Sequence, residues 1–305
     1  MSRTALPFAA LLVLFAFFTV ALRDDGFTTQ ANLTNIIRQT APETVMAVAV
    51  VFVLSAGEID LSLGAVVGLA ALVTAKVLQT QGAAVAVAAG LGVGLAAGLV
   101  NGALVTLLRL PSFLVTLGTM AVVAGLARTL TQLESVAVSD GGFVAVFGSG
   151  DVGPVPGLAL WGLGAVALGQ FAFRHTRFGA HVVATGDDAG VARIAGIRVD
   201  RVRVAVLTLS GLAAALAGIL YTGRLQGASY TLGEQDLLVV IAAVVIGGTR
   251  LMGGEGSVTG ALAGSLMLGT LTDGLILWGF SASEQMIAQG ALLLGAIALT
   301  LREPR

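Results

Sequence analysis

The stretch Ala83–Leu108, AAVAVAAGLGVGLAAGLVNGALVTLL, decides the fold class of this chain. It runs for 26 residues without a charged side chain, and about 20 predominantly apolar residues are enough for a helix to cross a membrane. Glycine recurs along it, and small residues let helix backbones approach one another closely inside a bilayer. The stretch therefore predicts a closely packed transmembrane helix.

The composition extends this reading to the whole chain of 305 residues. Hydrophobic residues make up 56% and charged residues 11%, against roughly 25% charged in ordinary soluble domains. So few charges cannot cover a soluble globule, and a net charge of −1 gives no basic footprint for nucleic acid. With no cysteine and only two histidines in the sequence, a disulfide scaffold is excluded and a metal site is not expected.

Nine further apolar runs predict an all-α polytopic membrane protein of about ten transmembrane helices, forming a single permease domain over residues 1–305. Eight of the ten candidates satisfy the length criterion without difficulty. The run 36–54 contains Arg38 and Glu43 and is expected to be partly interfacial. The run 237–247 covers only about 16 Å, so it spans with help or is re-entrant. The first run, 5–22, has a cleaved signal peptide as its alternative. The remaining runs are 59–78, 112–131, 158–173, 204–221, 257–277 and 285–301.

Two polar segments set the expected orientation. The loop 174–203 holds six arginines, whereas the loop 132–157 holds three acidic residues and no basic one. Basic residues in short loops favour the cytoplasmic side. We therefore expect loop 174–203 to be cytoplasmic, loop 132–157 to be external, and both termini to be cytoplasmic.

The single lysine, Lys76, excludes one class of energy source within this chain. A phosphate-binding loop requires a lysine that follows a glycine pair and precedes Ser or Thr. Lys76 lies in VTAKVL and has neither neighbour. If ATP drives this protein, a separate chain must hold the ATP. No arrangement of residues for catalysis is evident, so we expect a protein that is not an enzyme.

The first polar break in the apolar frame is Ser55–Gly64, SAGEIDLSLG, with Glu58, Asp60 and Ser62 between two apolar runs. Ionisable residues at membrane depth are costly and are functional candidates, so the break is a candidate lining of a solute path. The alternative is a plain loop in which Asp60 or Ser62 caps the helix that starts near Leu63.

Further polar side chains lie inside two neighbouring runs, at Asn101, Thr116 and Thr119, with Ser112 beside them. They are candidates for the neutral lining of a path for a polyhydroxylated solute. Alternatively, these hydroxyl and amide groups only bond across helices, as they often do in membranes.

The second break is Gly247–Ser257, GGTRLMGGEGS, where glycines resist a continuous helix. We expect a sharp turn or a re-entrant break at its glycines. Both breaks precede small-residue-rich apolar runs, in corresponding places of the two halves, and inverted repeats in transporters place broken segments in this way. An inverted repeat is therefore possible. The glycines are Gly247, Gly248, Gly253, Gly254 and Gly256.

The basic loop predicts a short helix that Asp187 or Asp188 caps and Gly196 ends. Val191, Ile194 and Ala195 would share one face of it. So short a helix needs support from a partner or the membrane, which favours a docking helix for a cytoplasmic partner. The alternative is a charged loop that only fixes topology.

Taken in order, these pieces resemble the permease subunits of bacterial ATP-binding-cassette sugar importers, the family of ribose, xylose, arabinose and galactose permeases. The motifs that carry the resemblance are 57–64 (GEIDLSLG), 101–102 (NG), 111–120 (PSFLVTLGTM), 176–179 (TRFG), 192–197 (ARIAGI), 241–248 (IAAVVIGG) and 253–257 (GGEGS). The sequence departs from the family at Glu58, where a second Gly is frequent, and at Asp187, where Asn is usual. Glu58 could alter the path near the break, whereas Asp187 keeps the capping ability.

The resemblance implies a multi-pass permease of the bacterial cytoplasmic membrane, in contact with lipid and not with nucleic acid. Its partners would be a second permease copy or a related permease, cytoplasmic ATPase subunits that hold ATP and Mg, and an external solute-binding protein. The cargo would be a pentose or hexose. The residues expected to couple to the ATPase are Arg177, Phe178, Gly179, Asp187, Asp188, Arg193 and Gly196.

Three alternatives stay open at this point. The same architecture could carry a nucleoside, a furanose signal molecule or a branched-chain amino acid. An ion-coupled secondary transporter could use Glu58 and Asp60 as proton or sodium sites. A membrane scaffold or a lipid-modifying enzyme is the third alternative.

Overall fold

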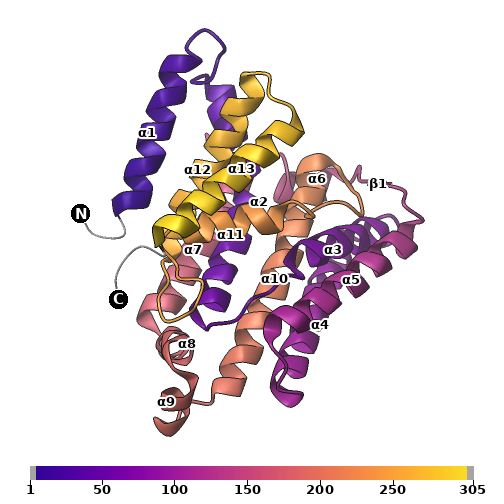
Figure 1. Cartoon of the computed structure of the whole chain (residues 1–305). Helices are drawn as coiled ribbons and strands as arrows, with labels where there is room; N and C mark the ends of the chain where they lie inside the picture. Colours follow the sequence, from indigo (N-terminus) through magenta and orange to yellow (C-terminus); the bar gives the residue numbers. More distant parts are fainter. Residues whose placement is uncertain (1–4, 301–305) are drawn as a thin grey trace.

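The computed structural model describes residues 5–300, and side chains within 6–295. The ten apolar runs all coincide with helices, which confirms the all-α polytopic fold (Figure 1). Among the described residues, six helices are long and apolar enough to cross a membrane, and α1, α3 and α11 are shorter apolar helices. The ten helices are α1 (Ala5–Ala21), α2 (Gln30–Ser55), α3 (Leu63–Leu78), α4 (Ala83–Leu107), α5 (Ser112–Thr131), α7 (Gly157–His175), α10 (Val199–Leu225), α11 (Asp236–Ile246), α12 (Val258–Leu277) and α13 (Ala282–Thr300).

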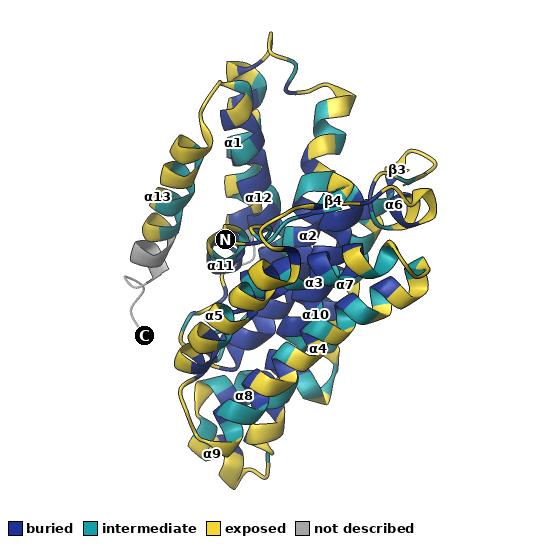
Figure 2. Ribbon diagram, turned by 90° about the vertical axis from the view of Figure 1, so that its right-hand side faces the viewer, coloured by how far each residue is buried: buried dark blue, intermediate teal, exposed yellow. Residues whose placement is uncertain are grey.

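The run 36–54 lies within a helix that is long and apolar enough to cross a membrane, and its partly interfacial position stays a prediction. It belongs to the 26-residue helix α2, which is buried through most of its length in the centre of the molecule (Figure 2). Arg38 is accommodated because it forms an ion pair with Asp151 of the 132–157 segment, at 2.7 Å. Sequence reasoning could not supply that partner, which lies 113 positions away.

The helices α2 and α10 form the core, and α4 packs along α10 through glycine. Four glycines of α4, at positions 90, 94, 98 and 102, repeat every fourth residue and are all buried. A Cβ on Gly98 would lie 2.6 Å from the Leu207 carbonyl oxygen and 2.6 Å from the Thr208 Cα. The backbones of α4 and α10 therefore approach as closely as the composition predicted, as in other small-residue contacts between membrane helices.

Two small polar regions lie at opposite ends of the helix bundle (Figure 1). The 132–157 segment contains β1 (Val136–Ala137), α6 (Gly141–Phe147), β2 (Asp151–Val152) and β3 (Val155–Pro156), and β1 pairs with β4 (Gly227–Ala228). The 174–203 segment contains α8 (Arg177–Asp187) and α9 (Ala189–Ile194). Arg3, Arg302 and Arg305 lie outside the described residues, so the orientation of the termini stays a prediction.

The helices next to the two breaks, α3 and α11, are too short to cross a bilayer core of about 30 Å by themselves. At 1.5 Å per residue, α3 reaches about 24 Å and α11 about 16 Å. The connection into α11 packs against α3, because a Cβ on Gly68 would lie 2.8 Å from the Leu232 carbonyl oxygen. Broken helices are tolerated at membrane depth where protein covers their backbone. An inverted repeat relating the two breaks stays a prediction.

Candidate functional site

The first break connects α2 to α3, and side chains of α5 hold its backbone. The amide of Ile59 donates to the Ser112 hydroxyl and the amide of Leu61 to the Thr116 hydroxyl, both at 3.0 Å. Thr116 is fully buried. The hydroxyls on α5 therefore supply the acceptors that a broken helix loses. Their predicted alternative role, bonding across segments, accounts for both contacts.

A polar network continues from the break into the core. Asp60 accepts from the Ser62 amide at 2.9 Å and from its hydroxyl at 2.6 Å, so it closes a local turn instead of capping α3. Asn101 donates to the Ser62 hydroxyl at 2.9 Å, and Thr119 donates to Asn101 at 2.6 Å. The structure thus joins Asp60, Ser62, Asn101 and Thr119 in one network. Whether a solute touches them stays a prediction.

The second break lies directly beside the first, and α8 covers both. The amide of Gly254 donates to the Ser55 carbonyl at 3.1 Å, which joins the glycine loop to the end of α2. A Cβ on Gly186 of α8 would overlap that same carbonyl and lie 2.8 Å from the Gly254 amide nitrogen. Gly253 and Gly254 adopt φ angles of +90° and +82°, which favour glycine. The predicted sharp turn is therefore present. It contacts the first break, whose Ser55 lies 200 positions before Glu255 in the sequence.

The helix α8 is anchored at its N-terminal end by a side-chain cap and an aromatic contact. Thr176 caps its N-terminus by accepting from the Gly179 amide at 3.4 Å. Phe178 stacks on Phe52 of α2, with ring centroids 5.7 Å apart. The remaining predicted coupling residues of this helix, Arg177 and Asp187, form its first and last positions. The basic loop therefore holds two helices where the sequence predicted one.

The short helix α9 is the predicted one. Asp188, and not Asp187, caps it by accepting from the amides of Gly190 and Val191 at 2.7 and 3.0 Å. Gly196 follows its end with φ +85°, and the Ile197 amide closes the last turn on the Ala192 carbonyl at 3.0 Å. This is the Schellman arrangement in which glycine is favoured. Val191 and Ile194 are 62% and 89% exposed, so the apolar face is free.

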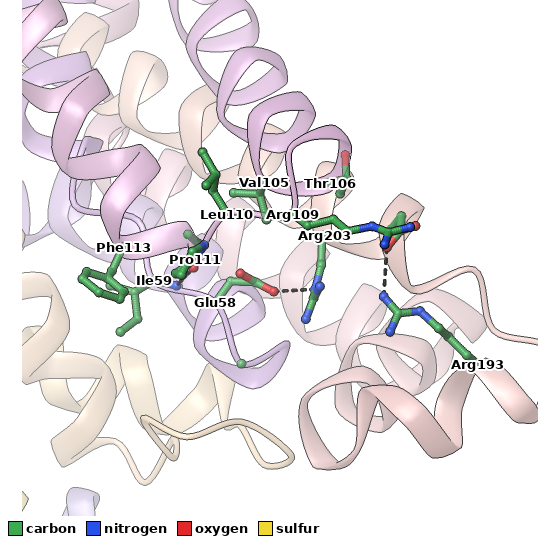
Figure 3. A pocket seen from close by; sticks show the side chains of 13 residues that line it. Glu58, Ile59, Val105, Thr106, Arg109, Leu110, Pro111, Phe113, Arg193 and Arg203 are labelled. Atoms are coloured by element: carbon green, nitrogen blue, oxygen red, sulfur yellow. Dashed lines mark hydrogen bonds and ion pairs between the residues drawn. The ribbon is translucent and has the colours of Figure 1, made fainter.

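A polar cavity of about 720 Å³ lies between the first break, the α4–α5 turn and α9 (Figure 3). Across it, Glu58 forms an ion pair with Arg203 of α10 at 2.6 Å, and both side chains point toward one another. The Glu58 side chain is only 6% exposed and Arg203 28%. The sequence grouped Glu58 with Asp60 as a candidate lining of the solute path. In the structure the two separate: Glu58 lines the cavity, whereas Asp60 belongs to the buried network with Ser62 and Asn101.

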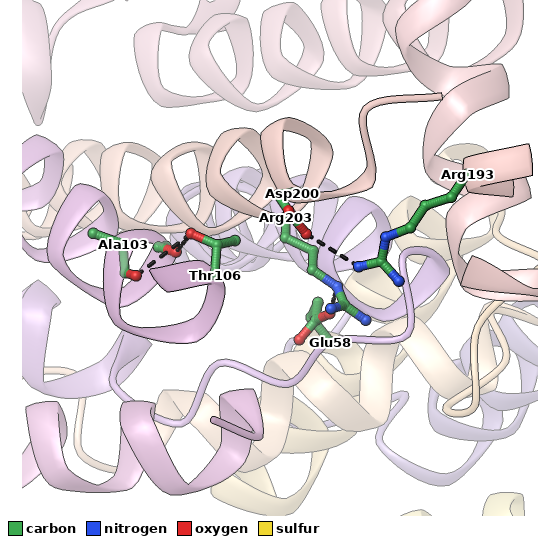
Figure 4. A network of polar contacts seen from close by, with 7 residues as sticks. Glu58, Ala103, Thr106, Arg193, Asp200 and Arg203 are labelled. Atoms are coloured by element: carbon green, nitrogen blue, oxygen red, sulfur yellow. Dashed lines mark hydrogen bonds and ion pairs between the residues drawn. The ribbon is translucent and has the colours of Figure 1, made fainter. Parts of the chain in front are cut away.

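A second ion pair connects the cavity to α9. Arg193 of α9 contacts Asp200 at 3.1 Å, and Asp200 precedes Arg203 by three residues on α10 (Figure 4). Residues three apart on a helix share a face. The two pairs therefore form a series from α9 through the first turn of α10 to the first break. The sequence did not place Asp200, Arg203 or Gly186 in the candidate site, because their partners are remote in sequence.

Comparison with known proteins matches residues 32–297 to the family described as branched-chain amino acid transport system / permease component. This chain is a member of that permease family. The permease is 38% identical over 292 residues to the ribose import permease protein RbsC of Escherichia coli K12, covering 94% of this chain and 90% of the relative. No solved structure matches the chain.

Other relatives of the permease bear the names of different sugars. The L-arabinose ABC transporter permease protein AraH of Azospirillum brasilense is 33% identical, over 94% of this chain and 84% of its own. The fructose import permease protein FrcC of Rhizobium meliloti is 33% identical, over 98% and 85%. A permease component is one part of a transport system, so the family identifies this chain as a multi-pass transport subunit that works with others.

Proposed function

We propose that this chain is the membrane permease of an ATP-driven importer for a small neutral sugar, a pentose or hexose. The observation that carries the proposal is the whole-length similarity to permeases named for ribose, arabinose and fructose. The family description favours branched-chain amino acids as the second candidate cargo.

The proposed assembly has two permease copies, or this chain with a related one, in the cytoplasmic membrane of a bacterium. ATP and Mg reside on two separate cytoplasmic ATPase subunits, and an external protein delivers the sugar. Loop 132–157 faces outward, and loop 174–203 and both termini face the cytoplasm. Six arginines in the second loop support that orientation. This chain itself performs no covalent chemistry.

The coupling step follows from what α8 and α9 touch. An ATPase that engages the exposed face of α9 moves α8 with it, since one residue, Asp188, separates the two helices. Because Gly186 of α8 lies against the Ser55 carbonyl and the Gly254 amide, that movement displaces both breaks together. The Arg193–Asp200 and Glu58–Arg203 pairs give a second connection from α9 to the first break. Displacing the breaks changes access to the solute path.

The first test is the partner set. The tagged permease is purified from solubilised native membranes and the co-purifying chains are identified by mass spectrometry. An ATPase subunit with a phosphate-binding loop and a solute-binding protein are expected. A chain that remains alone after crosslinking contradicts the assembly and leaves an ion-coupled transporter.

The second test is the cargo and the energy source. The purified assembly is reconstituted in vesicles and uptake of labelled ribose, arabinose, fructose and leucine is compared. Sugar uptake that requires ATP and survives an uncoupler is expected. Uptake of leucine alone would show that the cargo is a branched-chain amino acid and not a sugar. Uptake that collapses with an uncoupler would show that an ion gradient, and not ATP, drives transport.

A further inference from the structure

The α4–α5 turn places at the cavity one arginine, Arg109, that has no ion-pair partner among the described residues. Arg109 lines the cavity together with Arg193 and Arg203 (Figure 3). Arg193 and Arg203 have carboxylate partners, Asp200 and Glu58. None of the ion pairs between described residues includes Arg109. Three arginines and two carboxylates line the cavity, so one positive charge there has no complement.

The cavity adjoins the surface on which the proposed coupling depends. Arg193 lines the cavity and belongs to α9, whose Val191 and Ile194 are exposed. A protein that covers the apolar face of α9 therefore also lies over this wall of the cavity. The turn that carries Arg109 is built tightly, because Arg109 adopts φ +54° and Pro111 follows as the N-cap of α5. The exposed Arg109 side chain is thus carried by a short, constrained backbone connection.

We infer that the α4–α5 turn is a second docking contact for the ATPase subunit, and that the cavity receives an acidic side chain of that subunit on Arg109. The inference rests on the proposed function and adds a site to it. A carboxylate is the expected chemistry because it supplies the missing negative charge and matches the guanidinium in a two-pronged hydrogen bond. Once in the cavity, it lies among the two ion pairs that lead from α9 to the first break.

The first experiment uses site-specific crosslinking, for which the cysteine-free sequence offers a clean background. Thr106, which lines the cavity, is replaced by Cys and labelled with a benzophenone maleimide in the purified permease–ATPase complex. Glu134→Cys, in the polar loop at the opposite end, is the control. Illumination is expected to join position 106 to an Asp- or Glu-containing peptide of the ATPase and to leave position 134 unjoined. Adducts with lipid alone at position 106 would show that the arginine serves the membrane surface, and would overturn the inference.

The second experiment measures the affinity of the purified ATPase subunit for the detergent-solubilised permease at low and high salt. Arg109→Glu is expected to weaken binding about fivefold or more at low salt, and Arg109→Lys to restore most of it. Both variants carry a Cβ at φ +54°, so their backbone cost is the same. Arg128→Glu, which removes the Arg128–Glu234 pair at the other end, is the control for charge reversal.

The outcomes separate the two proposals. If no ATPase subunit binds the unaltered permease, the proposed function fails. If it binds, but Arg109→Glu and Arg128→Glu behave alike and position 106 gives no ATPase adduct, only the second docking contact is wrong.

Discussion

The ion pair between Glu58 and Arg203 makes a prediction that distinguishes its two partners. The atoms are 2.6 Å apart, which corresponds to a gross attraction of about 6 kcal/mol at an effective dielectric constant of about 20. Desolvation of the carboxylate cancels much of this. Arg203 is 28% exposed through the cavity, whereas the Glu58 side chain is 6% exposed. An unpaired Arg203 can therefore be hydrated, but an unpaired Glu58 cannot.

Removing the arginine should accordingly cost more than removing the carboxylate. We expect Arg203→Gln to destabilise the permease by about 3 kcal/mol and Glu58→Gln by about half as much. The double variant should recover about 1–3 kcal/mol relative to the sum of the two. The measurement is thermal unfolding in detergent, followed by the fluorescence of Trp161 and Trp278.

The matched control is the neighbouring pair Arg193–Asp200, whose side chains are 52% and 63% exposed. Its double-variant cycle should give about 0.5 kcal/mol or less and should vanish at high salt. The reasoning from burial is refuted if the two cycles give equal coupling energies, or if Glu58→Gln is the more damaging single change.

Three further predictions follow from individual contacts. Thr116→Val leaves the Leu61 amide without its 3.0 Å acceptor and should lower stability by about 1–3 kcal/mol, whereas Thr116→Ser should be nearly neutral in the same thermal assay. Asp188→Ala removes two capping bonds from α9, at a cost of about 1 kcal/mol, so hydrogen exchange over 189–195 should quicken while Asp188→Asn stays slow. Gly98→Val should separate α4 from α10 and reduce the yield of folded protein. Gly92→Val is the control, because a Cβ there meets open space and should leave the yield unchanged. Equal yields of the two variants would contradict the glycine contact.

The helices could be predicted from the sequence because each one leaves a local signal. The apolar runs 83–108, 112–131 and 257–277 predict helix ends close to those of α4, α5 and α12. Both ends of α9 could also be predicted, since an Asp cap at the start and a glycine after the end are signals in the local sequence. The charges of α2 could not be interpreted from the sequence, because Asp151, the partner of Arg38, lies in a remote segment.

The candidate site was less predictable because its contacts join distant residues. Glu58 and Asp60 stood out as costly charges, yet Arg203 lies 145 positions from Glu58 and looked like one more topology-setting arginine. The role of Gly186 could not be predicted, because the sequence does not distinguish an exposed glycine from one that packs against a carbonyl oxygen. The meeting of the two breaks under α8 depends on three separate segments.

The way the first break is satisfied has an electrical consequence. A membrane potential of 100 mV is worth about 2.3 kcal/mol for each charge that crosses. A continuous file of water through a broken helix would therefore let protons leak across the membrane. Here the amides of Ile59, Leu61 and Ser62 are bonded by side chains and not by solvent. Because side chains of Asp60, Ser112 and Thr116 satisfy these amides, the discontinuous helix needs no water at its break, and we expect the break itself not to conduct protons.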